Sequence, residues 1–213
     1  MLGATPQHYL EALEKLVCRL SLTELTAMAD AIVGVYEQQR TVFCCGNGGS
    51  AATASHFAAD LSKLTIVPGA RQRLRALSLN ESPAAMTAIG NDIQYEEVFA
   101  EQLRTYLQPG DVVLGLSTSG SSPNVLRALE YGRAMGAITM GITGAAGHPL
   151  KNRCMHCVMI DSTSVQHVEE LTLVAAHLLC VMTRAALMAL VAAGDEDEMT
   201  TMRDLDAVRA ASA

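Results

Sequence analysis

The chain has 213 residues, half of them hydrophobic, with 22 acidic and 15 basic side chains and a formal net charge of −7. This length and hydrophobic content suffice for one globular domain with a full core. The negative charge argues against nucleic acid as a main partner, so no direct nucleic-acid binding is expected.

Apolar periodicity and turn residues predict helices and strands that alternate along the chain. Two helices come first, over 6–20 and about 22–39, and the second opens with the capping-box spacing of Ser21 and Glu24. Further helices are expected at 50–63, from Ser82 with a break at 90–92, at 95–106 and at 125–135, and strands at 41–45, 74–79, 112–116, 138–142 and 157–160. This alternation indicates an α/β fold in three layers, α/β/α, with a mostly parallel sheet covered on both faces.

The end of the chain changes in character at about residue 194. The segment 171–193 is apolar enough to suggest a membrane helix, but it contains His177 and Arg184, so we expect a buried helix, suited to a subunit interface, and no membrane. The segment 194–213 carries six acidic and two basic residues, which predicts a solvated acidic tail. We therefore expect one domain over 1–193, including an N-terminal helical pair over 1–40.

The cellular compartment is predicted from the start of the chain and its cysteines. No basic segment followed by an apolar run opens the sequence, so no secretory signal is expected. Six cysteines in such a chain favour reduced thiols and a cytoplasmic protein.

A glycine-rich turn lies between the first predicted strand and the helix that follows. Gly48 and Gly49 permit a tight turn whose amides face a ligand, and the helix starts at Ser50. Free N–H groups and the positive end of the helix dipole favour an anion such as phosphate there. His56 and Asp60 share one face of the same helix. Two groups able to bind metal or transfer protons therefore lie about two turns from the candidate anion site.

A second polar loop follows the third predicted strand. It carries five hydroxyl side chains ahead of a helix, at Ser117, Thr118, Ser119, Ser121 and Ser122. Taken alone, the segment is also consistent with a plain polar loop. Two loops of this kind at the carboxyl ends of parallel strands favour a shared phosphate site instead.

The range 46–51 also fits the G-x-G-x-x-A fingerprint of dinucleotide-binding folds. That fold needs an acidic residue roughly 20 residues further on, and none lies between Asp60 and Glu81. Arg71 and Arg73 would suit a 2′-phosphate, so a nicotinamide enzyme remains a minor alternative.

Several motifs carry a resemblance to a known family. They are Cys45–Ser50, Thr87–Asp92, Tyr95–Phe99, and Leu116–Gly120 followed by Ser122–Val125. Over about residues 6 to 190 the chain resembles the sugar isomerase (SIS) domain family, and within it the phosphoheptose isomerases. The resemblance implies a flavodoxin-like, five-stranded parallel sheet and a homotetramer with sites between subunits. It also implies conversion of sedoheptulose 7-phosphate to D-glycero-D-manno-heptose 7-phosphate.

The resemblance also assigns roles to single residues. The implied substrate-binding set is Asn47, Gly48, Gly49, Ser50, Asp92, Ser117, Thr118, Ser119, Ser122 and Gln166. The implied zinc ligands are His56, Asp60, Glu169 and His177, and the last three are also the implied catalytic groups. The family has Glu where Asp60 stands and Gln where Glu169 stands. Carboxylate oxygen suits zinc, but a second anion would hold the metal more tightly and make it a weaker Lewis acid.

Several features leave alternatives open. Glu170 competes with Glu169 as a ligand because it is nearly eclipsed with His177 on the helix. Taken alone, His56 is consistent with a surface or packed histidine and His177 with a core histidine. The Cys154–Cys157 segment resembles a metal clip, but its alternation fits a strand edge better.

Three further departures from the family concern the substrate. An arginine of the family is replaced by Leu64, an aspartate by Gln166 and a histidine by Thr172. These changes leave the exact sugar open. The altered ligand set is compatible with lost catalysis, so we keep two non-catalytic alternatives, a binder of the replication initiator protein and a sugar-phosphate sensor.

Overall fold

The computed structural model describes residues 5–70 and 72–211, with side chains described as far as residue 193. Five strands form one parallel sheet in the order β2-β1-β3-β4-β5. They are β1 (Thr41–Gly46), β2 (Arg75–Ser78), β3 (Val112–Ser117), β4 (Ile138–Gly144) and β5 (His156–Ile160). This confirms the predicted flavodoxin-like sheet, whose strand order reverses between β1 and β3.

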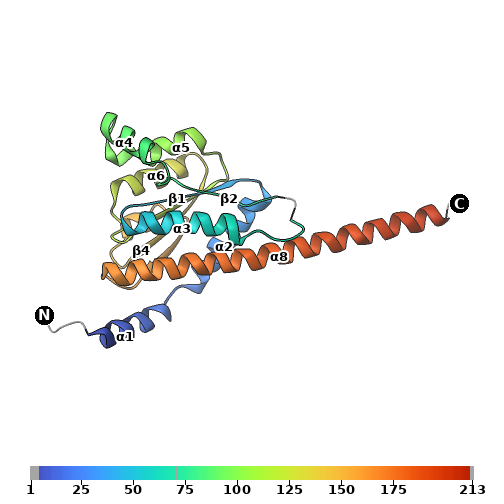
Figure 1. The fold of residues 1–213 in the computed structure, drawn as a ribbon, viewed down its shortest axis with the longest axis horizontal. Helices are drawn as coiled ribbons and strands as arrows, with labels where there is room; N and C mark the ends of the chain where they lie inside the picture. Colours follow the sequence, from blue (N-terminus) through green and yellow to red (C-terminus); the bar gives the residue numbers. More distant parts are fainter. Residues whose placement is uncertain (1–4, 71, 212–213) are drawn as a thin grey trace.

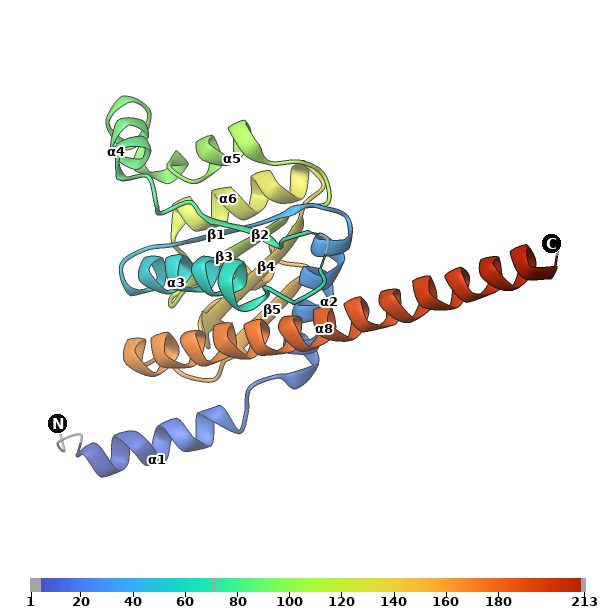
Figure 2. The ribbon, with the colours of Figure 1, turned by 45° about the vertical axis from the view of Figure 1, so that its right-hand side comes forward.

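Helices cover both faces of the sheet, as predicted (Figures 1 and 2). They are α1 (Pro6–Val17), α2 (Leu22–Glu37), α3 (Gly49–Leu64), α4 (Pro83–Asp92), α5 (Ala100–Tyr106), α6 (Pro123–Ala134), α7 (His148–Lys151) and α8 (Val165–Ala211), with a 3-10 turn η1 (Tyr95–Glu97). Helices α2, α3 and α8 pack on one face, around Ile32, Phe57 and Leu171. Helices α5 and α6 lie over the other face, around Phe99 and Leu129. The domain therefore has two apolar cores separated by the sheet.

The structure differs from the predicted helices in three places. Helix α4 continues through the expected break and ends at Asp92, because the chain turns extended only at Gln94. The single helix predicted over 95–106 is instead η1 followed by α5. The one-turn helix α7 was not predicted, since four residues carry no helical periodicity.

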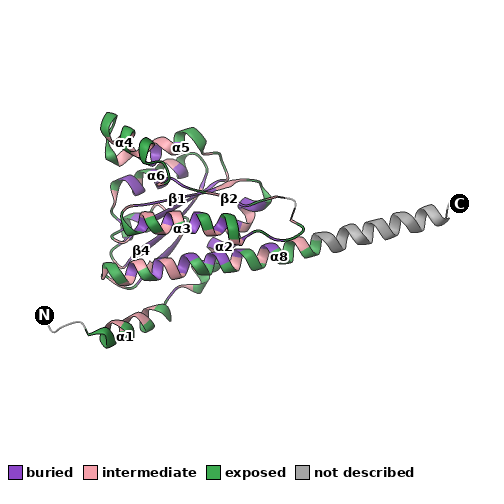
Figure 3. Cartoon of the chain, viewed as in Figure 1, coloured by how far each residue is buried: buried purple, intermediate pink, exposed green. Residues whose placement is uncertain are grey.

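Helix α8 is packed along one side only, which corrects the expectation of a buried helix. Leu171, Ala175 and Leu179 are buried on the side that faces α2 and α3, whereas Val181 and Met188 are exposed. Its alternating burial is visible in Figure 3. By length and composition the stretch Val165–Ala193 could cross a membrane, and one third of its most apolar window is buried. The predicted acidic tail over 194–213 lies outside the residues whose side chains are described, while the backbone of α8 runs to Ala211.

Candidate active site

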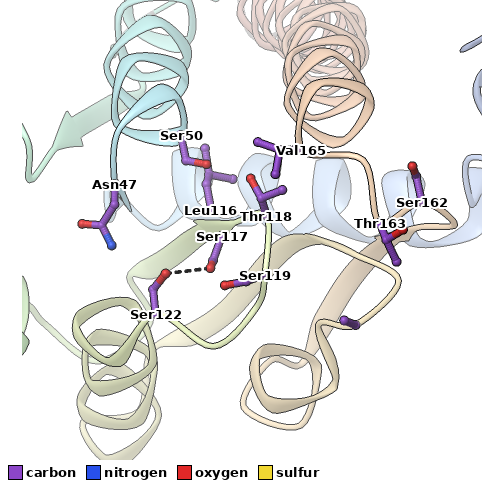
Figure 4. Close-up of a pocket in the computed structure, with 11 residues that line it drawn as sticks. Asn47, Ser50, Leu116, Ser117, Thr118, Ser119, Ser122, Ser162, Thr163 and Val165 are labelled. Carbon is purple, nitrogen blue, oxygen red and sulfur yellow. Dashed lines mark hydrogen bonds between the residues drawn. The ribbon is translucent and has the colours of Figure 1, made fainter. Parts of the chain in front are cut away.

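A cavity of about 340 Å³ opens at the carboxyl ends of β1 and β3 (Figure 4). Its lining residues are Asn47, Ser50, Leu116, Ser117, Thr118, Ser119, Ser122, Ala146, Ser162, Thr163 and Val165. Both predicted polar loops contribute to it, because the reversal of strand order separates the helices that follow β1 and β3. The two loops therefore border one shared space.

Six of the predicted substrate-binding residues line this cavity, and four do not. Gly48 is the N-cap of α3 and Gly49 its first residue. Asp92 is exposed at the end of α4, where it accepts a hydrogen bond from Asn91. Gln166 is exposed in the first turn of α8, next to the lining residue Val165.

The structure adds a wall that was not predicted, formed by the loops after β4 and β5. Ser162 and Thr163 line the cavity from the second of these loops, and Ala146 lines it from the first. The loops after β4 and β5 are connected by a hydrogen bond from Ala145 N to Ser162 O at 3.0 Å. A second bond, from Gly144 N to Thr118 O at 3.1 Å, connects the end of β4 to the loop after β3. The signal was present in the sequence, since a hydroxyl run follows β5 just as one follows β3.

The start of α3 supplies a favourable place for an anion. Gly48 has φ of 55° and offers no side-chain cap. The first N–H groups of a helix have no intrahelical acceptor. Within the described part of the chain, the N–H groups of Gly49 and Ser50 have no backbone or side-chain acceptor. None of the described lining residues is charged. An anion there would be held by hydroxyls, amides and the helix dipole.

The second loop is held in shape by its own hydroxyl groups. Ser117 Oγ lies 3.0 Å from Ser122 Oγ and also accepts from Gly120 N at 3.1 Å (Figure 4). Ser119 Oγ accepts from the Ser121 hydroxyl at 3.0 Å. Gly120 has φ of +63°, and a Cβ there would overlap the Cα of Gly147. The second loop therefore packs closely on the β4–α7 loop, with Gly120 against Gly147.

A partly buried amide pair holds Asn47 at the cavity edge. Asn47 and Asn124 exchange two side-chain hydrogen bonds of 2.8 Å each. The Tyr95 hydroxyl donates to Asn47 Oδ1 at 3.1 Å. Because Asn124 is only 1% exposed, it acts as a positioning residue that fixes how Asn47 presents its amide.

Replacing Asn124 with alanine should therefore weaken both the fold and substrate binding. Loss of the buried partner leaves polar atoms unpaired, which should lower the free energy of unfolding by about 1–3 kcal/mol. The midpoint of urea denaturation measures this effect, and KM reports on the displaced Asn47. The same change at the exposed Asn152 after α7 should alter neither quantity. An unchanged KM for Asn124→Ala would contradict the positioning role.

Three of the four predicted metal ligands come together between α3 and α8. One atom from each of His56, Asp60 and His177 lies within 4.8 Å of the other two. His56 Nε2 is 3.3 Å from Asp60 Oδ2, and His177 Nε2 is 3.6 Å from the same oxygen. The imidazole rings meet edge to face at 5.1 Å. Both histidines are about half exposed, so the core-histidine interpretation of His177 is wrong.

The fourth predicted ligand, Glu169, lies outside this cluster. Its side chain packs against the first residue of α3, because a Cβ at Gly49 would be 2.5 Å from Glu169 Oε1. The competing Glu170 points to another helix, where its hydrogen bond raises the pKa of Tyr9. Of the two carboxylates, only Glu169 therefore faces α3.

Comparison with known proteins gives consistent matches. The profile of the SIS domain family matches residues 8–144. A phosphoheptose isomerase from Desulfovibrio desulfuricans is 41% identical over 152 residues, 71% of each chain. A probable phosphoheptose isomerase from Thermoplasma volcanium is 36% identical over 172 residues, 81% of this chain and 87% of the relative. Phosphoheptose isomerase GmhA from Neisseria gonorrhoeae superimposes with a TM-score of 0.77 at 26% identity, covering 84% of this chain and 96% of the other.

Proposed function

This chain belongs to the SIS domain family, in its phosphoheptose isomerase branch, and we propose that it converts sedoheptulose 7-phosphate to D-glycero-D-manno-heptose 7-phosphate. One observation carries the proposal. A neutral, hydroxyl-lined cavity lies at the start of α3, and a His-Asp-His cluster lies further along that helix, where α8 supplies His177. A phosphate site next to proton-transfer groups is what an aldose–ketose isomerase of a phosphosugar requires.

The cavity supports binding of the phosphate end of the sugar. We propose that the hydroxyls of Ser50, Thr118, Ser119 and Ser122 surround the phosphate oxygens, with free amides at the start of α3 adding donors. Ser117 would act mainly by holding Ser122. Since none of these groups carries a full charge, specificity rests on the number and direction of the donors.

The spacing along α3 supports a linear sugar of this size. His56 is six positions after Ser50, which at a rise of 1.5 Å per residue is about 9 Å along the helix axis. That distance is comparable with the reach of an extended seven-carbon sugar phosphate. The carbonyl end would then lie at the cluster while the phosphate occupies the cavity.

The donor set of the cluster fits zinc. Tetrahedral zinc with bonds of about 2.0–2.1 Å places neighbouring ligand atoms about 3.3–3.4 Å apart. Asp60 Oδ2 lies 3.3 Å from His56 Nε2 and 3.6 Å from His177 Nε2. We propose that His56, Asp60 and His177 hold the ion, which would polarise the carbonyl and hydroxyl oxygens of the substrate. Glu169 is the proposed fourth ligand, and it would have to leave Gly49 by a change of rotamer.

The side chains of the cluster supply the proton transfer. Moving the carbonyl from C2 to C1 requires removal of a proton from C1 and its return to C2 through an enediol. We propose that His177 and a carboxylate, Asp60 or Glu169, carry these protons. Asp60 Oδ2 lies 3.6 Å from His177 Nε2, so these two candidate proton carriers stand side by side at the same point between α3 and α8.

We also propose a cytoplasmic homotetramer with sites between subunits. Helices α1 and α8 leave apolar side chains exposed, including Leu10, Val17, Val181 and Met188. A second copy packed on these helices would cover them. Light scattering on the purified protein tests the mass, and a monomer at micromolar concentration would contradict the proposal.

The activity is tested directly with sedoheptulose 7-phosphate. We expect the aldose product to appear by NMR, to be lost after chelation and to return with zinc. Metal content of the purified protein gives a second readout. A protein that holds no divalent metal and forms no product under any metal would instead be a phosphosugar-binding or replication-initiator-binding member of the family.

A further inference from the structure

Two cysteines converge at the edge of the sheet opposite the cavity. Cys157 is the cross-strand partner of Gly141 in the β4–β5 register. The Cys154 thiol packs on the same glycine, because a Cβ at Gly141 would be 2.7 Å from Cys154 Sγ. The two thiols are close enough for each to shift the pKa of the other, upward at Cys154 and downward at Cys157. A glycine at position 141 therefore leaves room for the Cys154 sulfur beside the strand position of Cys157.

The pair is accessible from one side and takes no part in the proposed reaction. Cys157 is buried at 8% exposure in the first half of the edge strand β5. Cys154 is half-buried just before the strand, next to the exposed Met155. The cavity lies beyond the other end of β5, so a small oxidant can reach Cys154 and Cys157 without entering it.

The surroundings distinguish these thiols from the other buried cysteines. The neighbouring Cys154 thiol, with a smaller contribution from Lys151, lowers the pKa of Cys157, although burial and Glu24 oppose the shift. By contrast, burial raises the pKa of Cys45 and of Cys180 to about 12. A thiolate is the reactive form of cysteine. Cys157 is therefore the favoured nucleophile and Cys154 its neighbouring partner.

We propose that Cys154 and Cys157 form a peroxide-sensitive dithiol that closes reversibly to a disulfide. The Cys-x-x-Cys spacing is the one used by redox-active pairs. The Cys157 thiolate attacks one oxygen of hydrogen peroxide, the O–O bond breaks, and the leaving hydroxide takes up a proton to become water. Cys154 then loses its proton and attacks the Cys157 sulfenic acid, forming the S–S bond and releasing a second water. Peroxide is reduced, two thiols are oxidised, and an added thiol reverses the change.

Alkylation of the oxidised protein tests this pairing. Trypsin releases a peptide spanning 154–184, which carries Cys154, Cys157 and Cys180. After peroxide treatment, denaturation and iodoacetamide, we expect one alkyl group on this peptide and a loss of two hydrogen atoms. After reduction we expect three alkyl groups. Buried Cys44 and Cys45, on a separate peptide, serve as an internal control and should stay reduced.

Single variants locate the nucleophile. In Cys154→Ser, peroxide should leave a sulfenic acid at Cys157 that dimedone traps, whereas in Cys157→Ser the remaining Cys154 should resist peroxide. Thermal melts check that both variants fold, since serine is close in size to cysteine. Three alkyl groups on the oxidised wild-type peptide would overturn the proposal, as would a disulfide between exposed Cys18 residues of two chains in its place.

Discussion

Replacing His177 with alanine is expected to lower kcat for the isomerisation by about 10²–10⁴-fold, the usual contribution of a positioned acid or base. His177 approaches Asp60 from the neighbouring helix α8, with 3.6 Å between Nε2 and Oδ2. Alanine removes a proton-transfer group and one of the three clustered metal ligands. The phosphate cavity is formed by other segments, so phosphate binding should be retained.

The two losses can be separated with a second variant. His56→Ala removes a ligand but leaves His177 and Asp60 in place, so saturating zinc should restore much of its activity. His177→Ala should stay inactive at any zinc concentration. His148→Ala, at an exposed histidine on α7, is the matched control and should behave as wild type. Full activity in His177→Ala would show that another group transfers the proton.

The two polar loops could be predicted from the sequence because their signals are local. A buried strand, small or hydroxyl residues and a helix start follow one another within a few residues, as in the stretch 41–50. The parallel sheet then brings the loops to one edge. The hydroxyl run at Ser162 and Thr163 has the same form after β5, yet its contact with the cavity depends on the joined loops of β4 and β5.

The metal cluster is only partly predictable from local sequence patterns. His56 and Asp60 are four residues apart on one helix, so their proximity follows from helical geometry. His177 joins them only because α8 packs on α3, which no local pattern encodes. The same packing brings the Glu169 carboxylate against Gly49. A family resemblance can match residues in sequence, but the contacts of each side chain depend on how the two helices approach.

Replacing Gly120 with alanine is expected to disrupt the phosphate-binding loop while leaving the His-Asp-His cluster intact. Gly120 has φ of +63°, and its absent Cβ would overlap the backbone of Gly147, which cannot move as a flexible side chain can. The left-handed conformation alone should reduce the free energy of unfolding by about 1–2 kcal/mol. Relief of the overlap would shift the loop that carries Ser119 and Ser122. Since a displacement of about 1 Å can cost about 10²-fold in rate, we expect a drop of that order in kcat/KM.

Gly34→Ala provides the matched control for this change. Gly34 lies inside α2, and a Cβ added there would meet nothing within 4 Å, so alanine should be neutral or stabilise by about 0.5–1 kcal/mol. Zinc binding measured by calorimetry should be the same in both glycine variants, because neither position touches His56, Asp60 or His177. If Gly120→Ala kept its phosphate affinity and kcat/KM, the hydroxyl loop would not be the anion site. If it lost zinc as well, the cavity and the cluster would depend on each other more closely than their separate segments indicate.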